Sequence, residues 1–425
     1  MRDTPQTAGQ TTGLGPAPTG RRASKVALCA LGAYGATLAV VVLGITAGAR
    51  WLAPASRPAS PRHVQPAGNA VVEALSLWDA QWYLEIASQG YSYHPRRQSA
   101  VAFFPAYPVL VRAVRDVTGL PLQAAGLVVS HGFLLGALVV LWRYGRQRFS
   151  KAPARAAGFA VASLAVFPTG LFFRMAYTES LFVFLCLLVF WGMERRWPPG
   201  VLAGIVGLAT ATRSVGVALV VPLAMHVWEQ SRSWRQAATR LAWVLPLSAW
   251  GILGYMGFQA AALGEPLAFV KTQQFWRMRP PLPVGEMVLV LGSWEPIWSV
   301  YLPGMPGYWR EVDRGLPLVL SYQSFNCVAF VAAAALLAAG GVKGWLSGRE
   351  LALGVCLLAI PYVSAGYRFC MASQGRYVSV VFPVYLVLGQ WLSRMPRLAA
   401  AGVLAVLAAY LGWFSAMLAA GYFMV

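Results

Sequence analysis

Long apolar runs separated by short arginine-rich stretches constrain this chain more than any other feature of its sequence. A helix needs about 20 apolar residues to cross the hydrocarbon core of a bilayer, and such runs recur along the chain. Hydrophobic residues make up 58% of the 425 residues and charged residues only 11%, against about a quarter charged in an ordinary globular protein. This composition excludes a soluble enzyme built around a single core.

The apolar runs predict an all-α polytopic membrane protein with about eleven transmembrane helices. They cover residues 26–48, 121–142, 155–173, 175–193, 200–212, 214–230, 241–262, 318–340, 349–366, 377–393 and 398–421. The segments 200–212 and 214–230 are short for this purpose, because 13 residues of helix reach only about 20 Å of the roughly 30 Å core. They must tilt or begin inside the protein. A cleaved signal peptide is the alternative for the first run, which is longer than the usual apolar region of such a peptide.

Charge predicts the orientation of these spans. The short connections that follow the even-numbered spans are all basic, which places them and the amino terminus in the cytoplasm. The net charge of +20 then reflects these loops and their contact with anionic membrane lipid. No basic domain with interleaved aromatic residues stands apart, so we expect no nucleic-acid partner.

The remaining sequence divides into a tail and two long outer loops. Residues 1–25 are rich in Thr, Gly, Pro and Gln and predict a disordered cytoplasmic tail. Residues 26–425 form one membrane domain, with outer loops at about 49–120 and 263–317 that are rich in aromatic residues. We expect amphipathic helices in these loops, folded onto the membrane domain.

Several kinds of site are missing from the sequence. The five cysteines form no CxxC pair and the four histidines are scattered, which predicts neither a disulfide framework nor a metal centre. No phosphate-binding glycine loop and no soluble nucleotide-binding domain are recognisable. We therefore expect no metal and no cofactor, and any activated substrate would reach this protein from the bilayer.

The strongest candidate for catalysis lies in residues 71–90, an amphipathic helix with Ser76 as its predicted N-cap and Gly90 at its end. Asp79 and Tyr83 are four residues apart and so share one face of this helix. An aspartate among tryptophans at an outer membrane surface is partly desolvated, which disfavours its charged form and suits a general base. The alternative is an interfacial helix with aromatic anchors, in which the aspartate interacts favourably with the positive end of the helix dipole.

Two arginines lie where an apolar chain tolerates few charges. Arg213 falls between the two short spans, where it needs an anionic partner or must extend toward water. Arg376, in residues 374–377, lies at the outer end of the tenth span. The planar donor fork of each guanidinium suits a phosphate, and anchoring to lipid headgroups is the alternative.

Three further stretches carry candidate residues. Residues 103–108 alternate aromatic residues with prolines, which predicts a wall for a lipid or sugar ring or, alternatively, an interfacial aromatic belt. Arg174 and Glu179 lie at an outer tip between two spans, where they either serve a site or pair with each other. Residues 271–279 of the second outer loop either cover a site from outside or form a charged loop.

Taken together, these motifs resemble the PIG-V family of membrane mannosyltransferases in its bacterial branch, within the GT-C glycosyltransferase superfamily. The resemblance extends over about residues 71–390. The matching stretches are WDAQWYLEIASQGY, FFPAYP, FPTGLFFRMAYTESLF, LATATRSVG, QQFWRMR and GRYVSVVFPVY. Each stretch alone is weak evidence for the family, whereas the order of all six on a chain with many spans is specific for it.

The resemblance implies a GT-C-like fold and an inverting glycosyltransferase that takes a sugar, usually mannose, from a polyprenyl-phosphate carrier on the non-cytoplasmic face. It also implies a catalytic carboxylate in the first outer loop, which is Asp79 here. GT-C enzymes often carry a two-acid motif, whereas Ala80 and Gln81 follow Asp79 in this chain, so we expect no metal. Val215 stands where the TRSNG-like stretch of the family often has a polar residue.

The predicted roles follow from the motifs and the resemblance together. Asp79 is the predicted base, and the predicted donor-phosphate ligands are Arg213, Arg376 and Arg277. The candidates for contact with the substrate are Trp78, Trp82, Tyr83, Glu179, Gln273, Trp276 and Tyr377.

The expected partners are a polyprenyl-phosphate-linked sugar, membrane lipid, and an acceptor that is a glycan, a lipid or a protein. The bacterial branch implies the plasma membrane. Two other classes compete with the enzyme: a flippase or transporter of lipid-linked sugar, and a non-catalytic partner of a transferase. Transporters often show internally repeated halves, and this sequence shows no such repeat.

Overall fold

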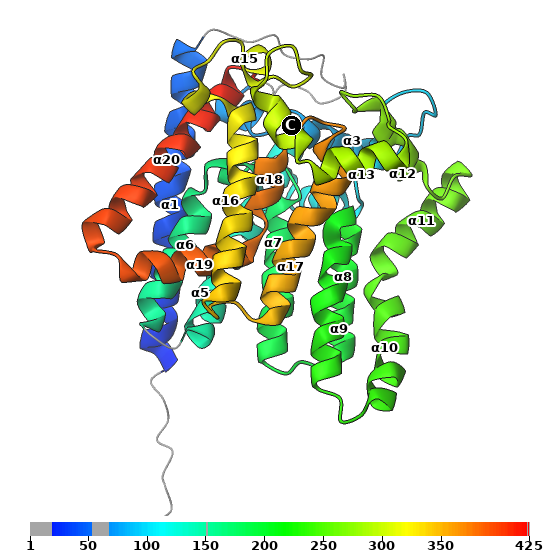
Figure 1. Cartoon of the computed structure of the whole chain (residues 1–425), viewed down its shortest axis with the longest axis vertical. Coiled ribbons are helices and arrows are strands. Elements are labelled where there is room, and N and C mark those ends of the chain that lie inside the picture. Colours follow the sequence, from blue (N-terminus) through cyan, green and yellow to red (C-terminus); the bar gives the residue numbers. More distant parts are fainter. Residues whose placement is uncertain (1–18, 53–67, 150–151, 423, 425) are drawn as a thin grey trace, which may run out of the picture.

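The computed structural model describes residues 19–52, 68–149, 152–422 and 424. Every regular element in these ranges is a helix and none is a strand, which confirms the predicted all-α class (Figure 1). The disordered tail was predicted to end at residue 25. This boundary is wrong, because helix α1 begins at Thr19. Residues 1–18 of that tail lie outside the described residues.

The α-helices are α1 (Thr19–Trp51), α2 (Ala70–Ala74), α3 (Asp79–Gln89), α4 (Ala106–Thr118), α5 (Leu122–Arg148), α6 (Pro153–Val166), α7 (Glu179–Glu194), α8 (Pro199–Thr212), α9 (Val220–Glu229), α10 (Trp234–Ser248), α11 (Trp250–Leu263), α12 (Ala268–Lys271), α13 (Val284–Gly292), α14 (Glu295–Trp298), α15 (Trp309–Val312), α16 (Tyr322–Val342), α17 (Gly348–Pro361), α18 (Gln374–Ser379), α19 (Phe382–Arg394) and α20 (Arg397–Ala419). The short 3-10 helices are η1 (Ala100–Ala102), η2 (Pro168–Phe173), η3 (Ser214–Leu219), η4 (Thr272–Phe275), η5 (Ser299–Tyr301) and η6 (Leu318–Leu320). A π-helix, η7 (Tyr362–Gly366), extends α17.

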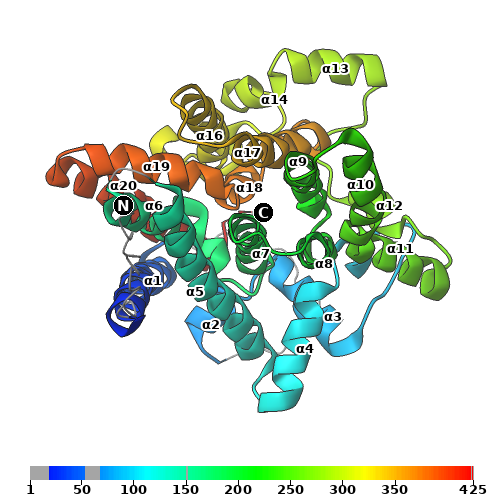
Figure 2. The same ribbon diagram turned by 90° about the horizontal axis from the view of Figure 1, so that it is seen from below.

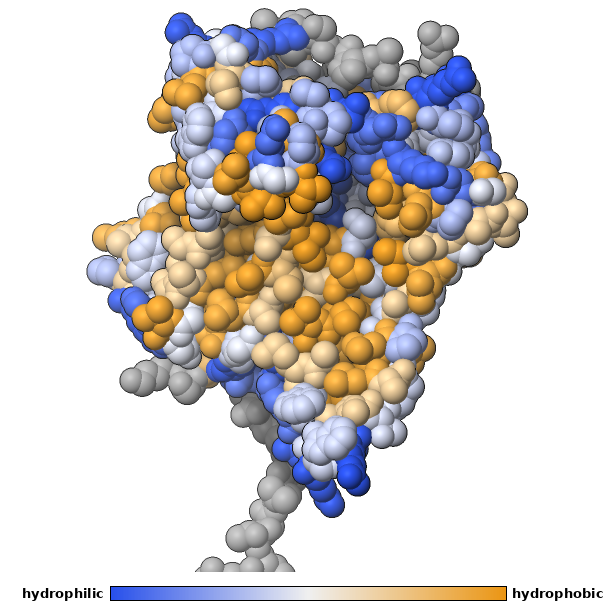
Figure 3. All heavy atoms as spheres, turned by 45° about the vertical axis from the view of Figure 1, so that its right-hand side comes forward, coloured by the Kyte–Doolittle hydropathy of each residue, from blue (hydrophilic) through white to orange (hydrophobic). Residues whose placement is uncertain are grey.

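Several of these helices are long and apolar enough to cross a membrane. By length and composition there are five among the described residues, namely Leu28–Trp51, Leu122–Arg148, Tyr322–Val342, Gly348–Gly366 and Arg397–Ala419. The bent pair α10–α11 makes a sixth if it is one span. Figure 3 shows an apolar band around the middle of one face, with polar residues above and below it. The chain is therefore a multi-pass membrane protein, and the count of eleven spans stays a prediction.

Two predicted spans differ from the observed helices at particular residues. The span predicted at 241–262 is broken by a bend of 48° between α10 and α11. Pro246 lies inside α10, where it has no N–H to donate and favours a kink. The span predicted at 377–393 begins earlier, as the short α18, and continues as α19 with a proline in its first turn.

The helix predicted at residues 71–90 is also interrupted. It forms α2 and α3, which are separated by a turn in which Trp78 has φ 60°. Ser76 is not an N-cap, because α3 begins three residues later without a side-chain cap hydrogen bond. Gly90 does end α3, as predicted. The interruption matters for the site, because it makes Asp79 the first residue of α3.

The helices form a bundle that is covered at one end. Figure 2 shows α5, α7 and α17 in the middle, α1 on one side and α10 and α11 on the other. The outer-loop helices α3, α12, α13 and α15 all lie at the upper end in Figure 1, opposite the end of the bundle at which α1 begins. Both loops predicted to be outer therefore meet at the same end of the bundle, where they can build one site.

Candidate active site

A cavity of about 1230 Å³ lies beneath the outer-loop helices. Its walls come from α3, the segment that follows α3, the turn between α8 and η3, the α12–η4 region, the end of α17 and the start of α18. Segments far apart in the sequence thus converge on one space. Asp79, Arg213 and Arg376, which were singled out from separate motifs, all line it.

The backbone around Asp79 is held by the segment that precedes α7. The Asp79 N–H donates a hydrogen bond to Tyr177 Oη at 3.0 Å, and the Tyr177 hydroxyl donates to Leu77 O at 3.2 Å. One residue earlier, the Ala176 N–H donates to Leu75 O at 3.0 Å. These bonds stabilise the turn before α3 and direct the Asp79 side chain, which is 18% exposed, to the cavity wall.

Four charged side chains form a continuous chain of ion pairs at this wall. Arg376 donates from Nη1 to Asp79 Oδ2 at 2.5 Å. Its Nε donates to Glu179 Oε1, and Arg213 donates from Nη1 to the same oxygen. Two carboxylates and two guanidiniums therefore alternate and balance in charge.

Aromatic rings surround the two guanidiniums. The Arg376 Cζ lies 4.5 Å from the centroid of the Tyr177 ring, and the Arg213 Cζ lies 5.7 Å from that of Tyr377. Arg376 is only 4% exposed. A cation held over ring faces and away from water interacts strongly with nearby anions, because screening is weak there.

Glu179 lies behind the cavity wall. It is fully buried and does not line the cavity, so the structure does not place it in contact with a substrate as predicted. The alternative pairing of Arg174 with Glu179 is also wrong. Arg174 instead donates to Gly170 O at 2.9 Å and to Thr37 Oγ1, while the two cations on Glu179 are Arg213, between α8 and η3, and Arg376 of α18.

The predicted aromatic contacts also line the cavity. Trp82 stacks on Phe103 with centroids 5.7 Å apart, and Trp276 approaches these rings at 6.0 and 6.1 Å. Trp78, Gln273 and Tyr377 line the cavity as well. The structure therefore brings together every predicted substrate contact except Glu179.

Tyr83 lies between these aromatic rings and the ion pairs. It lines the cavity, and its hydroxyl lies 3.4 Å from Thr178 Oγ1. Burial raises the pKa of Tyr83 to about 12, because desolvation disfavours the phenolate. The hydroxyl is therefore neutral near pH 7 and can donate a hydrogen bond.

Arg277, the third predicted phosphate ligand, does not belong to this group. It is exposed and does not line the cavity. Three arginines that the sequence analysis did not select do line it, namely Arg96, Arg97 and Arg368. No ion pair joins these three to a carboxylate in the ranges described.

A backbone contact explains how Arg368 reaches the cavity. Its carbonyl oxygen accepts from the N–H of Met278 at 2.8 Å and of Arg279 at 3.2 Å. These two bonds hold the second outer loop against the segment that follows η7, and Arg279 is further fixed within the loop by its ion pair with Glu295 at 2.8 Å. The sequence could have indicated Arg96 and Arg97 as cavity residues, because they are adjacent arginines within an aromatic loop. No distinctive pattern surrounds Arg368.

Among the described residues, no group of three or more His, Cys, Asp or Glu side chains could hold a metal ion. The groups in the cavity that can act chemically are a carboxylate, guanidiniums beside it, and aromatic rings. Such a set can take a proton from a hydroxyl, stabilise an anion and hold a ring.

Comparison with known proteins shows which family this chain is similar to. Residues 37–239 match the mannosyltransferase (PIG-V) family model. The match confirms the PIG-V resemblance predicted from the motifs. It includes Asp79, Glu179 and Arg213, whereas Arg376 and the second outer loop lie beyond it.

Curated relatives that match this chain are described as GPI mannosyltransferases. GPI alpha-1,6-mannosyltransferase 2 of Cricetulus griseus is 26% identical over 287 residues, which are 63% of this chain and 53% of that protein. The Rattus norvegicus protein is 30% identical over 177 residues, which are 38% of this chain and 34% of that one. The match thus spans about half the length of the first of these curated relatives and about a third of the second.

Two solved structures have helices in a partly similar arrangement. ArnT from Cupriavidus metallidurans bound to undecaprenyl phosphate covers 87% of this chain and 61% of its own, with 14% identity and a TM-score of 0.45. The Archaeoglobus fulgidus oligosaccharyltransferase tethered with an acceptor peptide covers 91% and 55%, with 12% identity and a TM-score of 0.41.

Proposed function

We propose that this protein is a glycosyltransferase that moves a sugar from a lipid-phosphate carrier to an acceptor hydroxyl in the cavity beneath the outer loops. The observation that carries this proposal is the Asp79 carboxylate at the cavity wall, ion-paired to Arg376 at 2.5 Å. The family match supports transfer of mannose.

In the proposed step, Asp79 accepts the proton of the acceptor hydroxyl. Since Oδ2 accepts from Arg376, we assign Oδ1 to the acceptor. The hydroxyl oxygen forms a bond to the anomeric carbon while the bond from that carbon to the carrier phosphate breaks on the opposite face. The phosphate leaves with the electron pair, and the anomeric configuration inverts. A positioned base of this kind contributes about 10²–10⁴-fold to rate.

The departing phosphate needs cationic donors. The observed hydrogen bonds of Arg213 use Nη1, and those of Arg376 use Nε and Nη1, so we assign Nη2 of both side chains to the phosphate. Arg368 replaces Arg277 as the third ligand, because Arg368 lines the cavity. Donors held in place away from water stabilise a developing anion without having to reorganise.

The rest of the cavity suits the other parts of the donor. The stacked Trp82 and Phe103 provide ring faces against which a sugar can pack. Leu357, Ile360 and Pro361 of α17 give the cavity an apolar wall, which suits a prenyl chain that enters from the bilayer. We therefore propose a polyprenyl phosphate as the carrier.

The cavity lies at the end of the bundle opposite the basic connections. By the charge rule those connections are cytoplasmic, so we propose that transfer takes place on the non-cytoplasmic face of the plasma membrane. The acceptor is a hydroxyl of a glycan, lipid or protein that reaches the cavity from that side.

The decisive experiment measures transfer from polyprenyl-phosphate-mannose by the purified full chain and by Asp79→Asn, with a panel of glycan, lipid and peptide acceptors. We expect the substitution to lower kcat by about 10²–10⁴-fold, because the amide cannot accept the proton. Asp116→Asn is the matched control, since Asp116 is 53% exposed and its one ion pair among the described residues is with its neighbour Arg115.

Each result separates the possible classes of protein. Transfer that depends on Asp79 supports the enzyme. Near-normal turnover by Asp79→Asn would show that Asp79 is not the base that accepts the proton of the acceptor. Movement of the lipid-linked sugar across vesicle membranes without transfer would indicate a flippase, and neither activity would indicate a non-catalytic partner.

A further inference from the structure

Glu179 occupies an unusual position for a charged residue. It is the first residue of α7, has no exposed surface, and pairs with two arginines from different parts of the chain. Both guanidiniums donate to one oxygen, Oε1, while Oε2 is buried without a hydrogen-bond partner in the described structure. Since Glu179 does not line the cavity, its role must act through its neighbours.

The contacts of Arg376 show what Glu179 can control. One edge of this guanidinium is held by Glu179 through Nε, and Nη1 extends to Asp79. A guanidinium is planar and rigid, so two anchors in different directions determine its orientation. The position of the Asp79 carboxylate therefore depends on a contact that Glu179 makes from inside the protein.

Glu179 also controls the charge of the cavity wall. With it, the ion-pair chain contains two acids and two guanidiniums; without it, one guanidinium is uncompensated. A buried charge that loses its partner interacts strongly with any anion that can reach it. The anion available in the proposed reaction is the carrier phosphate.

We propose that Glu179 is a positioning residue that orients Arg376 against Asp79 and limits the positive charge that Arg213 and Arg376 present to the carrier phosphate. This inference rests on the proposed glycosyl transfer. It assigns Glu179 two effects on the same reaction: it aligns the base, and it prevents the product phosphate from binding so tightly that it cannot leave.

Glu179→Gln should therefore slow turnover while strengthening product binding. We expect kcat to fall on the order of a hundredfold, which is the scale of a misplacement of about 1 Å near the reacting atoms. We expect the Kd for undecaprenyl phosphate to fall about tenfold, because one more cation faces the phosphate. Quenching of tryptophan fluorescence measures this Kd, since Trp78, Trp82 and Trp276 line the cavity.

The two readouts together separate positioning from a structural role. Slower turnover combined with tighter lipid binding is expected of a residue that orients Arg376 and limits the charge of the wall. A purely structural role predicts less folded protein and weaker lipid binding.

Two variants serve as controls. Glu179→Asp keeps the charge but shortens the side chain by one methylene, so it should restore the Kd while turnover recovers only in part. Glu295→Gln removes another buried carboxylate paired with an arginine, Arg279, at 2.8 Å, away from the cavity lining. It should lower thermal stability without tightening the binding of undecaprenyl phosphate.

The double variant Glu179→Gln, Arg213→Gln covers the case in which the single variant does not fold. It removes one anion together with one cation, which leaves Asp79 paired with Arg376 and the wall balanced. Its Kd for undecaprenyl phosphate should not fall below that of the unmodified protein, because the wall gains no net positive charge and loses one proposed phosphate donor, Arg213. Tenfold tighter binding in this double variant would contradict the charge role.

The outcomes separate this inference from the proposed function. Unmodified protein that transfers sugar, with Glu179→Gln retaining its kcat and its Kd for undecaprenyl phosphate, would overturn the inference and leave the function standing. Weaker binding of undecaprenyl phosphate by Glu179→Gln would overturn it as well. Absence of transfer by the unmodified protein would overturn the proposed function, whereas tighter lipid binding by Glu179→Gln would still support the charge role.

Discussion

At the scale of single residues, Arg376 joins the parts of the site. Its guanidinium contacts Asp79 and Glu179 in two directions and lies over the Tyr177 ring. A single positive charge could neutralise one carboxylate, but only a planar fork can hold both at a set angle. The geometry of the fork should therefore matter more than its charge.

Arg376→Lys tests this point. Lysine keeps the charge but replaces the fork with one ammonium group, which cannot reproduce both contacts. We expect the chain to fold and kcat to fall about tenfold to a hundredfold, because the base is less well placed. Arg279→Lys, at a buried arginine away from the cavity lining, is the matched control for stability. Equal transfer rates in Arg376→Lys and the unmodified protein would contradict a geometric role.

At the scale of elements, close packing of α1 against α20 joins the two ends of the chain. A side chain on Gly44 would meet the backbone of Gly412, and one on Gly48 would meet the backbone of Ala416. Small residues let helices approach closely in a membrane, where association depends on packing and not on exclusion of water. This packing makes α1 a structural part of the bundle, in agreement with its prediction as a first span.

Gly48→Leu should therefore destabilise the protein. The added side chain has no space against Ala416, and overpacking of this kind costs about 1–3 kcal/mol. Thermal unfolding in detergent measures the loss. Gly32→Leu on the same helix is the control, because nothing lies within 4 Å of a side chain at that position. Equal melting temperatures for the two variants would show that the α1–α20 contact is not tight.

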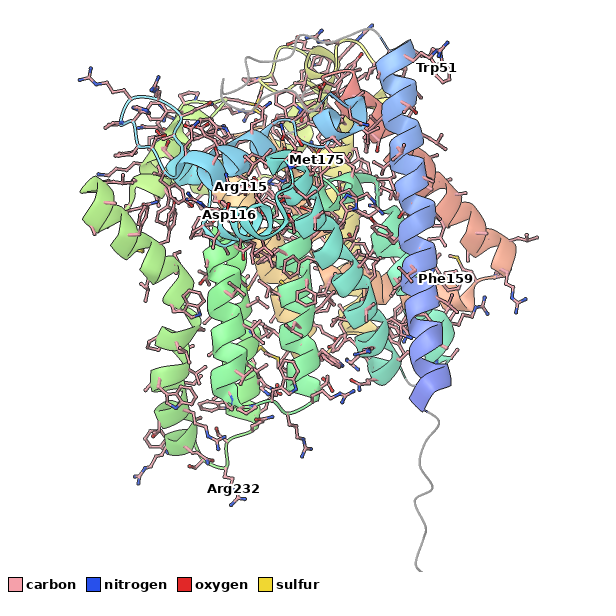
Figure 4. All side chains as sticks on the ribbon, turned by 180° about the vertical axis from the view of Figure 1, so that it is seen from behind. Trp51, Arg115, Asp116, Phe159, Met175 and Arg232 are labelled. Atoms are coloured by element: carbon pink, nitrogen blue, oxygen red, sulfur yellow. The ribbon has the colours of Figure 1, made fainter. Side chains whose placement is uncertain are left out.

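At the scale of the whole molecule, both long loops lie at the same end of the bundle. Figure 4 shows Arg115 and Asp116 in the upper half, with Trp51, and Arg232 at the lower end. The basic connections predict a cytoplasmic lower end. The proposed site and the amino terminus would then lie on opposite sides of the membrane.

Labelling of single cysteines in intact cells tests this orientation. In a variant without native cysteines, Asp116→Cys should react with an impermeant maleimide from outside, because Asp116 is 53% exposed. Arg232→Cys should react only after permeabilisation. The opposite pattern would place the cavity in the cytosol and would contradict the proposed use of a donor on the non-cytoplasmic face.

The sequence predicted the parts of the fold that depend on local pattern. The boundary between α8 and η3 at Arg213 agrees with the two short spans predicted there. By contrast, the break between α2 and α3 was missed, because no local pattern places Trp78 at a positive φ. Contacts of Leu75, Leu77 and Asp79 with residues 176–177 support that turn, and these partners are about a hundred residues away in the chain.

Some residues of the candidate site could be predicted from the sequence, and others could not. Asp79, Arg213 and Arg376 were recognisable because charged residues are costly next to apolar spans. Arg277 was predicted to bind phosphate but is exposed outside the cavity, whereas Arg368, which was not selected, lines it. Glu179 was predicted to contact the substrate but is buried and does not line the cavity, since burial depends on what packs around a side chain and not on its neighbours in sequence.

By itself the sequence determined an all-helical membrane protein and the charged residues within it, because apolar length and the cost of charge near lipid are local properties. Only the tertiary structure decided that a glutamate behind the cavity wall holds two arginines that line the cavity, and that an aspartate lies beside them on the same wall. These ion pairs join residues 79, 179, 213 and 376, and only the packing of their helices brings such distant residues within the few ångströms over which charges bind strongly.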